Sequence, residues 1–388
     1  MNYYIQATFL ILYFSTTCLF SQAVKKNNNA LLPRNCYIKY IYNFPYKAST
    51  VYYSDHFPDL EIRKHENSEI IFPLFDVIFK ENYPVYNPNF WGNVEDLVQN
   101  GPPDLIDTNG ILLYMHAGWD TGFSISINNQ IIPQPYYTPP DFHDISGLFF
   151  FETWYIDPDK GFFNKHVIAY FPIREYWNEY LLQAGQAERL RRLVLMVYTG
   201  LPESKRNKSI SKNKYKGYNL LYSGIEYEMG LYNRPYNKYL YRDNSKAEIS
   251  DQEFNEWQYH TFDFYKHFDA DRFLKVITQH ALTGKVTAVE PANHAKVLTR
   301  EDIIARIRDD IYFDTEDDGD HIMVPPASIR YDNLNSIVFN EDWYFDPVSL
   351  NIYKIINSIT IVRTDYQYDD YTGDFMRAIK TPVLTVIY

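Results

Sequence analysis

The feature of this chain that most constrains its fold is an internal repeat at a spacing of 189 residues. Residues 151–199 align with residues 340–388 without a gap, and ten of the 49 aligned pairs are identical. Five identities fall in one seven-residue stretch, where Glu152, Trp154, Tyr155, Asp157 and Pro158 meet Glu341, Trp343, Tyr344, Asp346 and Pro347. A solenoid repeats every 20–50 residues or so, so this longer spacing indicates two similar units in one chain.

Each copy of the repeat has the pattern of a small antiparallel sheet. Residues 151–156 are mostly aromatic or β-branched, as in a strand, and Asp157-Pro158-Asp159-Lys160-Gly161 has the residues of a type I turn closed by a glycine bulge. Residues 162–171 and 351–362 predict the returning strands, and residues 193–199 and 383–388 predict a third strand in each copy. Leu350 stands where Gly161 should recur, so the second turn is less regular.

Helical patterns precede each sheet. An apolar stripe predicts a helix over residues 271–282, and Gly284 follows where a C-terminal cap belongs. Thr299 and Asp302 have the spacing of a capping box that opens another helix, and residues 74–82 and 93–99 hold weaker helical patterns in the first half. The order of helices followed by a sheet predicts an α+β fold of two related units.

The repeated tryptophans and tyrosines have two interpretations. Trp154 and Trp343 hold equivalent positions and are expected to fill the core of each unit. Because neighbouring strand residues point to opposite faces, Tyr155 and Tyr344 would lie on the other face and are candidate interface residues. The repeated Arg174 and Arg363 are further interface candidates.

Composition narrows the range of functions. Aromatic residues make up 18% of the chain and include 37 tyrosines. Tyrosine has an apolar ring and a polar hydroxyl, so it suits partly hydrated surfaces such as protein interfaces or sugar-binding sites. An AT-rich genome would also raise the tyrosine content. The net charge of −12 argues against nucleic acid as a partner, because nucleic-acid binding needs concentrated positive charge.

The N-terminal and middle regions differ from the two units. Residues 1–22 have the apolar core and small residue near the end that are typical of a signal peptide, and Cys18 offers lipidation as an alternative. Residues 200–256 are rich in lysine and tyrosine and are expected to form a polar linker between a first unit at 23–199 and a second at 257–388. No later stretch is long and apolar enough for a transmembrane helix.

Catalytic and metal-binding patterns are weak. Residues 314–320 resemble a calcium loop, but Pro325 occupies the position where a bidentate glutamate is needed, so an exposed acidic loop is the preferred interpretation. Ser124 and Ser126 lack the second glycine of a nucleophile elbow. The chain is therefore expected to be non-enzymatic, with no cofactor and no metal.

Three segments resemble the GldN family, also called PorN, of gliding motility and type IX secretion proteins in Bacteroidetes. Trp154–Asp157 with Ala169–Tyr176 resembles the family's tryptophan-containing strand and its Pro-Ile-Arg-Glu-Tyr segment. Leu195–Tyr198 with Pro202-Glu203 resembles its closing strand, and Ala281–Ala288 resembles its Gly-Lys-Ile-Thr-Ala segment. The Gly-Lys-Ile-Thr-Ala segment comes early in the family, but its best match here lies in the second unit. The tryptophan-containing strand and the closing strand come later in the family, but their best matches lie in the first unit.

The resemblance implies a periplasmic structural subunit. Such a protein would form a ring with a GldK-type outer-membrane lipoprotein, would self-associate, and would reach the membrane only through its partners. The alternative is a secreted carbohydrate-binding protein that uses tyrosine and tryptophan side chains as platforms. A ring subunit should capture the lipoprotein and bind no sugar, which separates the two hypotheses.

Overall fold

The fold combines antiparallel sheets with short helices, as expected for a mixed α and β protein. It is seen in a computed structural model that describes residues 36–44, 46–51, 61–89, 94–125, 131–156, 163–177, 189–201, 218–231, 248–250, 265–266, 268–307, 314–315, 321–322, 334–368 and 375–388. The predicted signal peptide and the turn residues Asp157 and Pro158 lie outside these ranges. Within them, no helix is long and apolar enough to cross a membrane.

The first sheet has the strand order β11-β8-β7-β6-β1-β12, with β9 also paired to β7. Every pairing in it is antiparallel. Its strands are β1 (Cys36–Asn43), β6 (Ile145–Ile156), β7 (Phe163–Trp177), β8 (Arg189–Leu193), β9 (Val197–Tyr198), β11 (Glu248–Ser250) and β12 (Tyr265–Lys266). The repeat segment 151–199 therefore supplies the centre of this sheet.

The second sheet has the order β10-β17-β18-β19-β13-β14. Its strands are β10 (Asn219–Gly230), β13 (Thr287–Glu290), β14 (Asn293–Val297), β17 (Leu334–Asp346), β18 (Asn351–Tyr368) and β19 (Phe375–Ile387). All of its pairings are antiparallel as well. The repeat segment 340–388 supplies β18, β19 and half of β17.

Strand β10 corrects the prediction that residues 200–256 are a linker. Residues 219–230 form the edge of the second sheet and bury Leu221, Ile225 and Met229. The pairing of β10 with β17 shifts register on either side of Tyr222. The buried residues Leu221, Ile225 and Met229 all hold odd-numbered positions, so the strand pattern is present. It was overlooked because the lysine-rich run at residues 205–216 made the whole segment resemble a polar connection.

The two sheets repeat the same pairing register at the spacing of 189 residues. Trp154 pairs with Lys165 between β6 and β7, and Trp343 pairs with Lys354 between β17 and β18. The register also shifts at the same repeat position, after Phe151 in the first sheet and after Asn340 in the second. A bulge is a specific feature of a strand pair, so its recurrence is stronger evidence of likeness than strand order alone.

The turn between β17 and β18 forms without a glycine. The Asp346 carboxylate accepts a hydrogen bond from the Val348 backbone N–H at 3.0 Å, and Pro347 follows Asp346 as the turn prediction requires. Leu350 adopts the left-handed conformation with φ of 53°, which glycine tolerates better than leucine. The Leu350 side chain is fully buried, and this burial offsets the cost of its backbone conformation.

The helices are α2 (Ser68–Glu81), α3 (Val94–Asn100), α4 (Thr108–Tyr114), α7 (Ala270–Leu282) and α8 (Arg300–Ile307), with a 3-10 turn η1 (Phe142–Asp144). Helices α3, α7 and α8 lie close to their predicted positions, α2 begins six residues before the predicted start at residue 74, and α4 was not predicted. The predicted capping box opens α8, because the Asp302 N–H donates to Thr299 Oγ1 and the Thr299 N–H donates to Asp302 Oδ2. Gly284 takes a φ of 69° just beyond α7.

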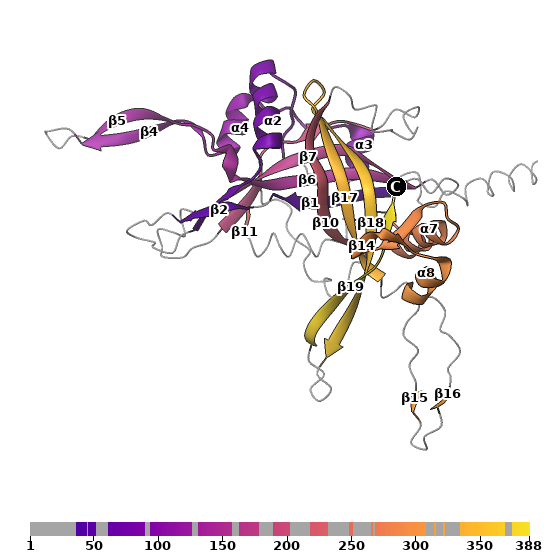
Figure 1. Ribbon diagram of the computed structural model, residues 1–388. Coiled ribbons are helices and arrows are strands. Elements are labelled where there is room, and N and C mark those ends of the chain that lie inside the picture. The colour runs from indigo at the N-terminus through magenta and orange to yellow at the C-terminus, as the bar shows by residue number, and fades with distance from the viewer. Residues whose placement is uncertain are drawn as a thin grey trace, which may run out of the picture.

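One hydrophobic core joins the two sheets. The strands of the first sheet cross those of the second, with α2 and α4 near one end of the assembly and α7 and α8 near the other (Figure 1). Buried residues from β1, β6, β10 and β17 belong to a single cluster together with residues of α2 and α7. A second cluster covers the opposite face of the first sheet and includes Val94 and Leu97 of α3. The first sheet is thus covered on both faces.

Three two-stranded hairpins accompany these sheets. They are β2 (Tyr46–Val51) with β3 (Glu61–His65), β4 (Gly118–Ile125) with β5 (Ile131–Thr138), and β15 (Asp314–Thr315) with β16 (His321–Ile322). The β4–β5 hairpin extends away from the rest of the molecule (Figure 1). Of the acidic segment 314–320, only Asp314 and Thr315 are described, and Pro325 is outside the described residues.

Candidate functional site

The centre of the core holds two ion pairs that exchange partners between the sheets. Lys165 of β7 lies 2.6 Å from the carboxylate of Glu341 on β17, and Lys354 of β18 lies 2.7 Å from the carboxylate of Glu152 on β6. All four side chains are completely buried. Each lysine thus binds the glutamate of the other repeat copy. We call these four residues the exchanged ion pairs.

Each glutamate also accepts a hydrogen bond from the tryptophan two residues along its own strand. The Trp154 indole N–H donates to Glu152 at 2.9 Å, and the Trp343 indole N–H donates to Glu341 at 2.8 Å. Trp154 is 1% exposed and Trp343 is 0% exposed, so both are core residues, but they lie in one core shared by the two sheets and not in a separate core for each unit. Each tryptophan therefore also acts as a hydrogen-bond donor, which orients the glutamate carboxylate of its own strand toward the lysine of the other sheet.

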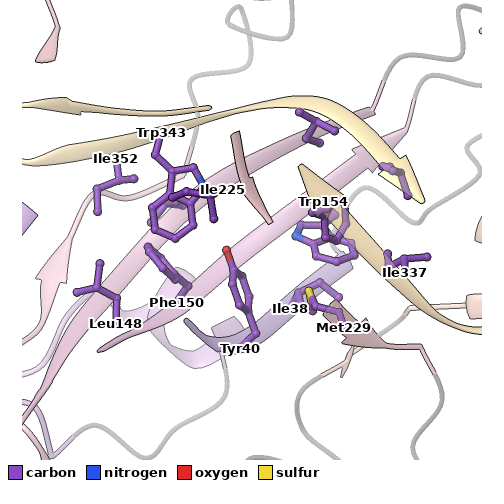
Figure 2. Packing of buried hydrophobic residues seen from close by; sticks show 14 of the residues in the cluster. Ile38, Tyr40, Leu148, Phe150, Trp154, Ile225, Met229, Ile337, Trp343 and Ile352 are labelled. Carbon is purple, nitrogen blue, oxygen red and sulfur yellow. The ribbon is translucent and has the colours of Figure 1, made fainter. Parts of the chain in front are cut away.

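Two tyrosines complete the polar centre. Tyr40 of β1 and Tyr227 of β10 stack with ring centroids 5.4 Å apart and planes only 7° apart. The Tyr40 hydroxyl donates to Glu152 and the Tyr227 hydroxyl donates to Glu341, each at 3.0 Å. Lys354 donates to the Tyr40 hydroxyl, and Lys165 donates to the Tyr227 hydroxyl at 2.7 Å. Tyr40 lies among Phe150, Trp154 and Trp343 in the same cluster (Figure 2).

Aromatic rings surround the buried lysines in the same exchanged pattern. Lys165 lies 3.0 Å from the ring centroid of Phe339 in the second sheet, and Lys354 lies 3.2 Å from that of Phe150 in the first. Phe150 and Phe339 are themselves separated by 189 residues. Cation–π attraction compensates part of the hydration that each ammonium group loses on burial.

Burial and charge act against each other in this cluster. Burial lowers the pKa of Lys354 to about 8, although Glu152 opposes the shift. Burial also lowers the pKa of Lys165, against the attraction of Glu341. For Glu152, burial acts to raise the pKa, but Lys354 and Lys165 outweigh it and hold that pKa below its usual value. The pair of Glu152 and Lys354 therefore remains charged at neutral pH.

The hydroxyls serve as donors in this arrangement. Burial raises the pKa of Tyr40 and that of Tyr227 well above the usual value, and the nearby glutamates raise them further. Both phenols are therefore protonated at any physiological pH. The exchanged ion pairs are completely buried and link the two sheets. Removing one partner would leave an uncompensated charge in the core, so these contacts hold the sheets together.

The candidate interface tyrosines are half-buried. Tyr155 lies on β6 opposite Asn164 of β7, and Tyr344 lies on β17 opposite Tyr353 of β18. Both follow a buried tryptophan and so belong to the sheet face away from the shared core. In the first sheet that face carries the second hydrophobic cluster, whose members include Phe149 and Phe151.

The same face is polar in the second sheet. Positions 149, 151 and 171 hold phenylalanine in the first copy, and their counterparts are Val338, Asn340 and Thr360. Asn357 donates to Asn340 at 3.2 Å and to Asp342 at 2.9 Å across this face. The two copies therefore share a core-facing surface but differ in the surface that faces away from it.

Arg174 and Arg363 occupy equivalent positions with different burial. Arg174 is buried, lies 3.4 Å from Asp144, and stacks over the ring of Tyr176 at 4.7 Å. Burial lowers the pKa of Arg174, and Asp144 opposes that shift. Arg363 is half-buried and pairs with Leu334 at the start of β17. The structure does not bring either arginine to the exchanged ion pairs.

The sequence contained a signal for this site that was not used. Glu152 and Lys165 recur as Glu341 and Lys354, so the four charged residues were already visible as repeated identities. Charged residues within otherwise apolar strands are expected to be paired when buried. Tyr40 and Tyr227 lie outside the ungapped alignment and gave no signal. Within the described ranges, no group of three or more His, Cys, Asp or Glu side chains is placed to hold a metal.

Comparison with known proteins bears on the C-terminal part of the chain. Residues 236–388 match the sequence model of the family described as gliding motility associated protein GldN. No curated protein matches the chain. The matched range contains the Ala281–Ala288 segment and the whole second repeat copy. The stretch from residue 236 to the C-terminus therefore belongs to the GldN family of gliding motility associated proteins, as the Ala281–Ala288 segment predicted, while the other two resembling segments lie outside the matched range.

Proposed function

We propose that the chain is a non-enzymatic structural subunit of a gliding motility and type IX secretion machinery. In this proposal it is exported to the periplasm and assembles there as a ring with a GldK-type outer-membrane lipoprotein. The match of residues 236–388 to the GldN family carries the proposal. We further propose that the chain arose by internal duplication, supported by the common pairing register and the common bulge of the two sheets.

The architecture suits a load-bearing subunit. The two sheets share one core, and the exchanged ion pairs tie the first copy to the second through four buried side chains. Pulling the copies apart would expose two buried lysines and two buried glutamates together. Such separation is costly, because each charge would lose its partner before it became fully hydrated.

We assign partner binding to the sheet face that carries Tyr344. The polar side chains there, with Asn340 and Asn357 half-buried, tolerate both water and a protein surface. The equivalent face around Tyr155 is largely occupied by the second hydrophobic cluster. Tyr344→Ala should therefore weaken assembly more than Tyr155→Ala, and the double variant should resemble Tyr344→Ala.

Co-expression with the GldK-type lipoprotein tests this function. Complexes of the wild type and the tyrosine variants would be separated by size-exclusion chromatography, with Leu113→Ala as a control that removes an exposed apolar side chain from α4. The proposal predicts a large complex for the wild type and the control, and a reduced yield for Tyr344→Ala. A chain that elutes alone in every case would contradict it.

The alternative of a carbohydrate-binding protein loses its first candidate platforms. Trp154 and Trp343 are buried and donate their indole N–H groups within the core, so neither offers a ring face to a sugar. A glycan array with the purified chain provides the direct comparison. A ring subunit should give no signal above background, whereas reproducible binding to one sugar class would favour the alternative.

A further inference from the structure

The β4–β5 hairpin is an arm that no other described strand extends. Its two strands pair only with each other across the described part of the chain, and the hairpin stands clear of the body (Figure 1). A two-stranded hairpin in water is at best marginally stable, and three or more strands or a packed face are usually needed. The arm therefore requires a covering surface to be stable.

The arm carries a concentration of exposed apolar side chains. Fourteen large hydrophobic residues are exposed among the described residues, and five of them lie on this hairpin. Their exposed fractions are 77% for Trp119, 69% for Ile131, 44% for Ile132, 48% for Tyr136 and 47% for Tyr137. The other nine are distributed over the remainder of the described chain, from Phe72 to Ile387. Clustered exposed apolar residues mark an interaction site.

The pairing register sorts these side chains onto two faces. Trp119 pairs with Tyr137, and their rings contact each other at 5.4 Å. Alternation along β5 puts Ile131, Pro133 and Pro135 on the same face as Tyr137. Asp120 pairs with Tyr136 on the other face, where the Tyr136 hydroxyl donates to Asp120 at 3.2 Å. The arm thus has one apolar face and one more polar face.

The prolines limit how the arm associates. Pro133 and Pro135 have no N–H, so both fit β5 only where a donor toward β4 is not needed. The missing donors therefore lie along the outer edge of β5. Open-ended association of hairpins needs free backbone N–H and C=O groups on both outer edges. Prolines on one edge remove N–H donors there and prevent it. The β5 edge is therefore closed to a further strand, whereas the apolar face remains open to association.

The near-absence of charge on the arm suits a second copy of this chain as the occupant of the apolar face. The chain carries a net charge of −12, so two copies repel each other over most of their surfaces. Asp120 is the only charged residue between Gly118 and Thr138. The arm is therefore where two like-charged copies meet with least repulsion. The same net charge disfavours an anionic lipid surface as the partner.

We propose that two copies of this chain associate by packing the apolar faces of their β4–β5 arms against each other, with Trp119 and Tyr137 at the centre. A surface that contacts itself in this way gives a two-fold symmetric interface, in which every apolar side chain is used twice. The inference deepens the proposed function by naming the self-association surface of the subunit, and it rests on that function for its cellular setting.

Adjacent tyrosines provide a matched test. Tyr136 and Tyr137 are exposed to the same degree on opposite faces of β5, so Tyr137→Ser and Tyr136→Ser remove equal aromatic area from different faces. Sedimentation velocity over a concentration series would measure self-association of the purified full chain with no lipoprotein present. Tyr137→Ser, alone or with Trp119→Ser, should weaken association about tenfold or more, as expected for a central aromatic residue. Tyr136→Ser should stay close to the wild type.

Several outcomes would overturn the inference. A wild-type chain that remains monomeric at every concentration would do so, as would equal losses in Tyr136→Ser and Tyr137→Ser. Binding to phosphatidylglycerol vesicles that depends on Trp119 without any dimer would identify a membrane-binding arm instead. Circular dichroism on each variant confirms that the fold is retained. Because no lipoprotein is present, failure here leaves the co-expression test of the proposed function unaffected.

Discussion

Removing one partner of an exchanged ion pair should show which glutamate each lysine stabilises. Lys165→Met leaves the Glu341 carboxylate buried without its cation, and removal of one partner from a buried pair costs about 3–5 kcal/mol. Glu341→Gln likewise leaves the Lys165 ammonium group buried without its anion. Each single variant should therefore lose a large share of the roughly 5–15 kcal/mol that stabilises an ordinary domain.

The double variant distinguishes an exchanged pair from a pair within one copy. Lys165→Met with Glu341→Gln removes both charges, and the glutamine oxygen still accepts hydrogen bonds from Trp343 and Tyr227. Its cost should be smaller than that of either single variant. Lys165→Met with Glu152→Gln removes the charges of one repeat copy, and here the departure from additivity should be smaller, because Lys165 acts on Glu152 only as the second of its two cations.

Urea unfolding followed by circular dichroism and tryptophan fluorescence gives the four free energies of each cycle. The exchanged pair should show a coupling free energy of about 2–3 kcal/mol, near the upper end for residues in direct contact. The pair within one copy should show a clearly smaller coupling. Equal coupling in the two cycles would refute the exchange, because each lysine would then serve both glutamates alike.

Two further predictions concern the same core. Glu152 has a pKa below its usual value in the folded state, so the unfolded chain binds more protons in acid. The stabilising contribution of the Glu152 carboxylate should therefore be lost as the pH falls below about 4.3. The free energy of unfolding, measured against pH, should fall less steeply in acid for Glu152→Gln than for the wild type, and an unchanged slope would reject the role of this carboxylate. Trp154→Ala and Trp343→Ala should each cost about 3–5 kcal/mol, measured by urea unfolding, because each removes a large buried aromatic ring. A melting shift within error for both tryptophan variants would contradict their place in the core.

Much of the framework was predictable because it depends on local patterns. Residues 271–282 have a continuous apolar stripe, and α7 occupies residues 270–282. The spacing of Thr299 and Asp302 predicted the cap that opens α8. The ungapped repeat also predicted that Trp154 and Trp343 would occupy equivalent places, and they share the same register opposite Lys165 and Lys354.

The remaining features depend on contacts that a linear pattern does not contain. Strand β10 was missed because its alternating residues follow the lysine-rich run at 205–216, and only its pairing with β17 shows that it belongs to a sheet. The choice between Glu152 and Glu341 as the partner of Lys165 is a tertiary choice, and both glutamates are equally good partners in sequence. The β4–β5 hairpin was not predicted, because Pro133 and Pro135 within β5 argue against a strand in the sequence.

Isolation of the chain from its own cells tests the central claim most directly. A tagged copy would be purified in mild detergent, its partners identified by mass spectrometry, and the particles imaged by electron microscopy. The account predicts closed rings that contain many copies of the chain together with a GldK-type lipoprotein. Single particles of the chain alone, with no lipoprotein recovered, would contradict the assignment as a structural subunit of that machinery.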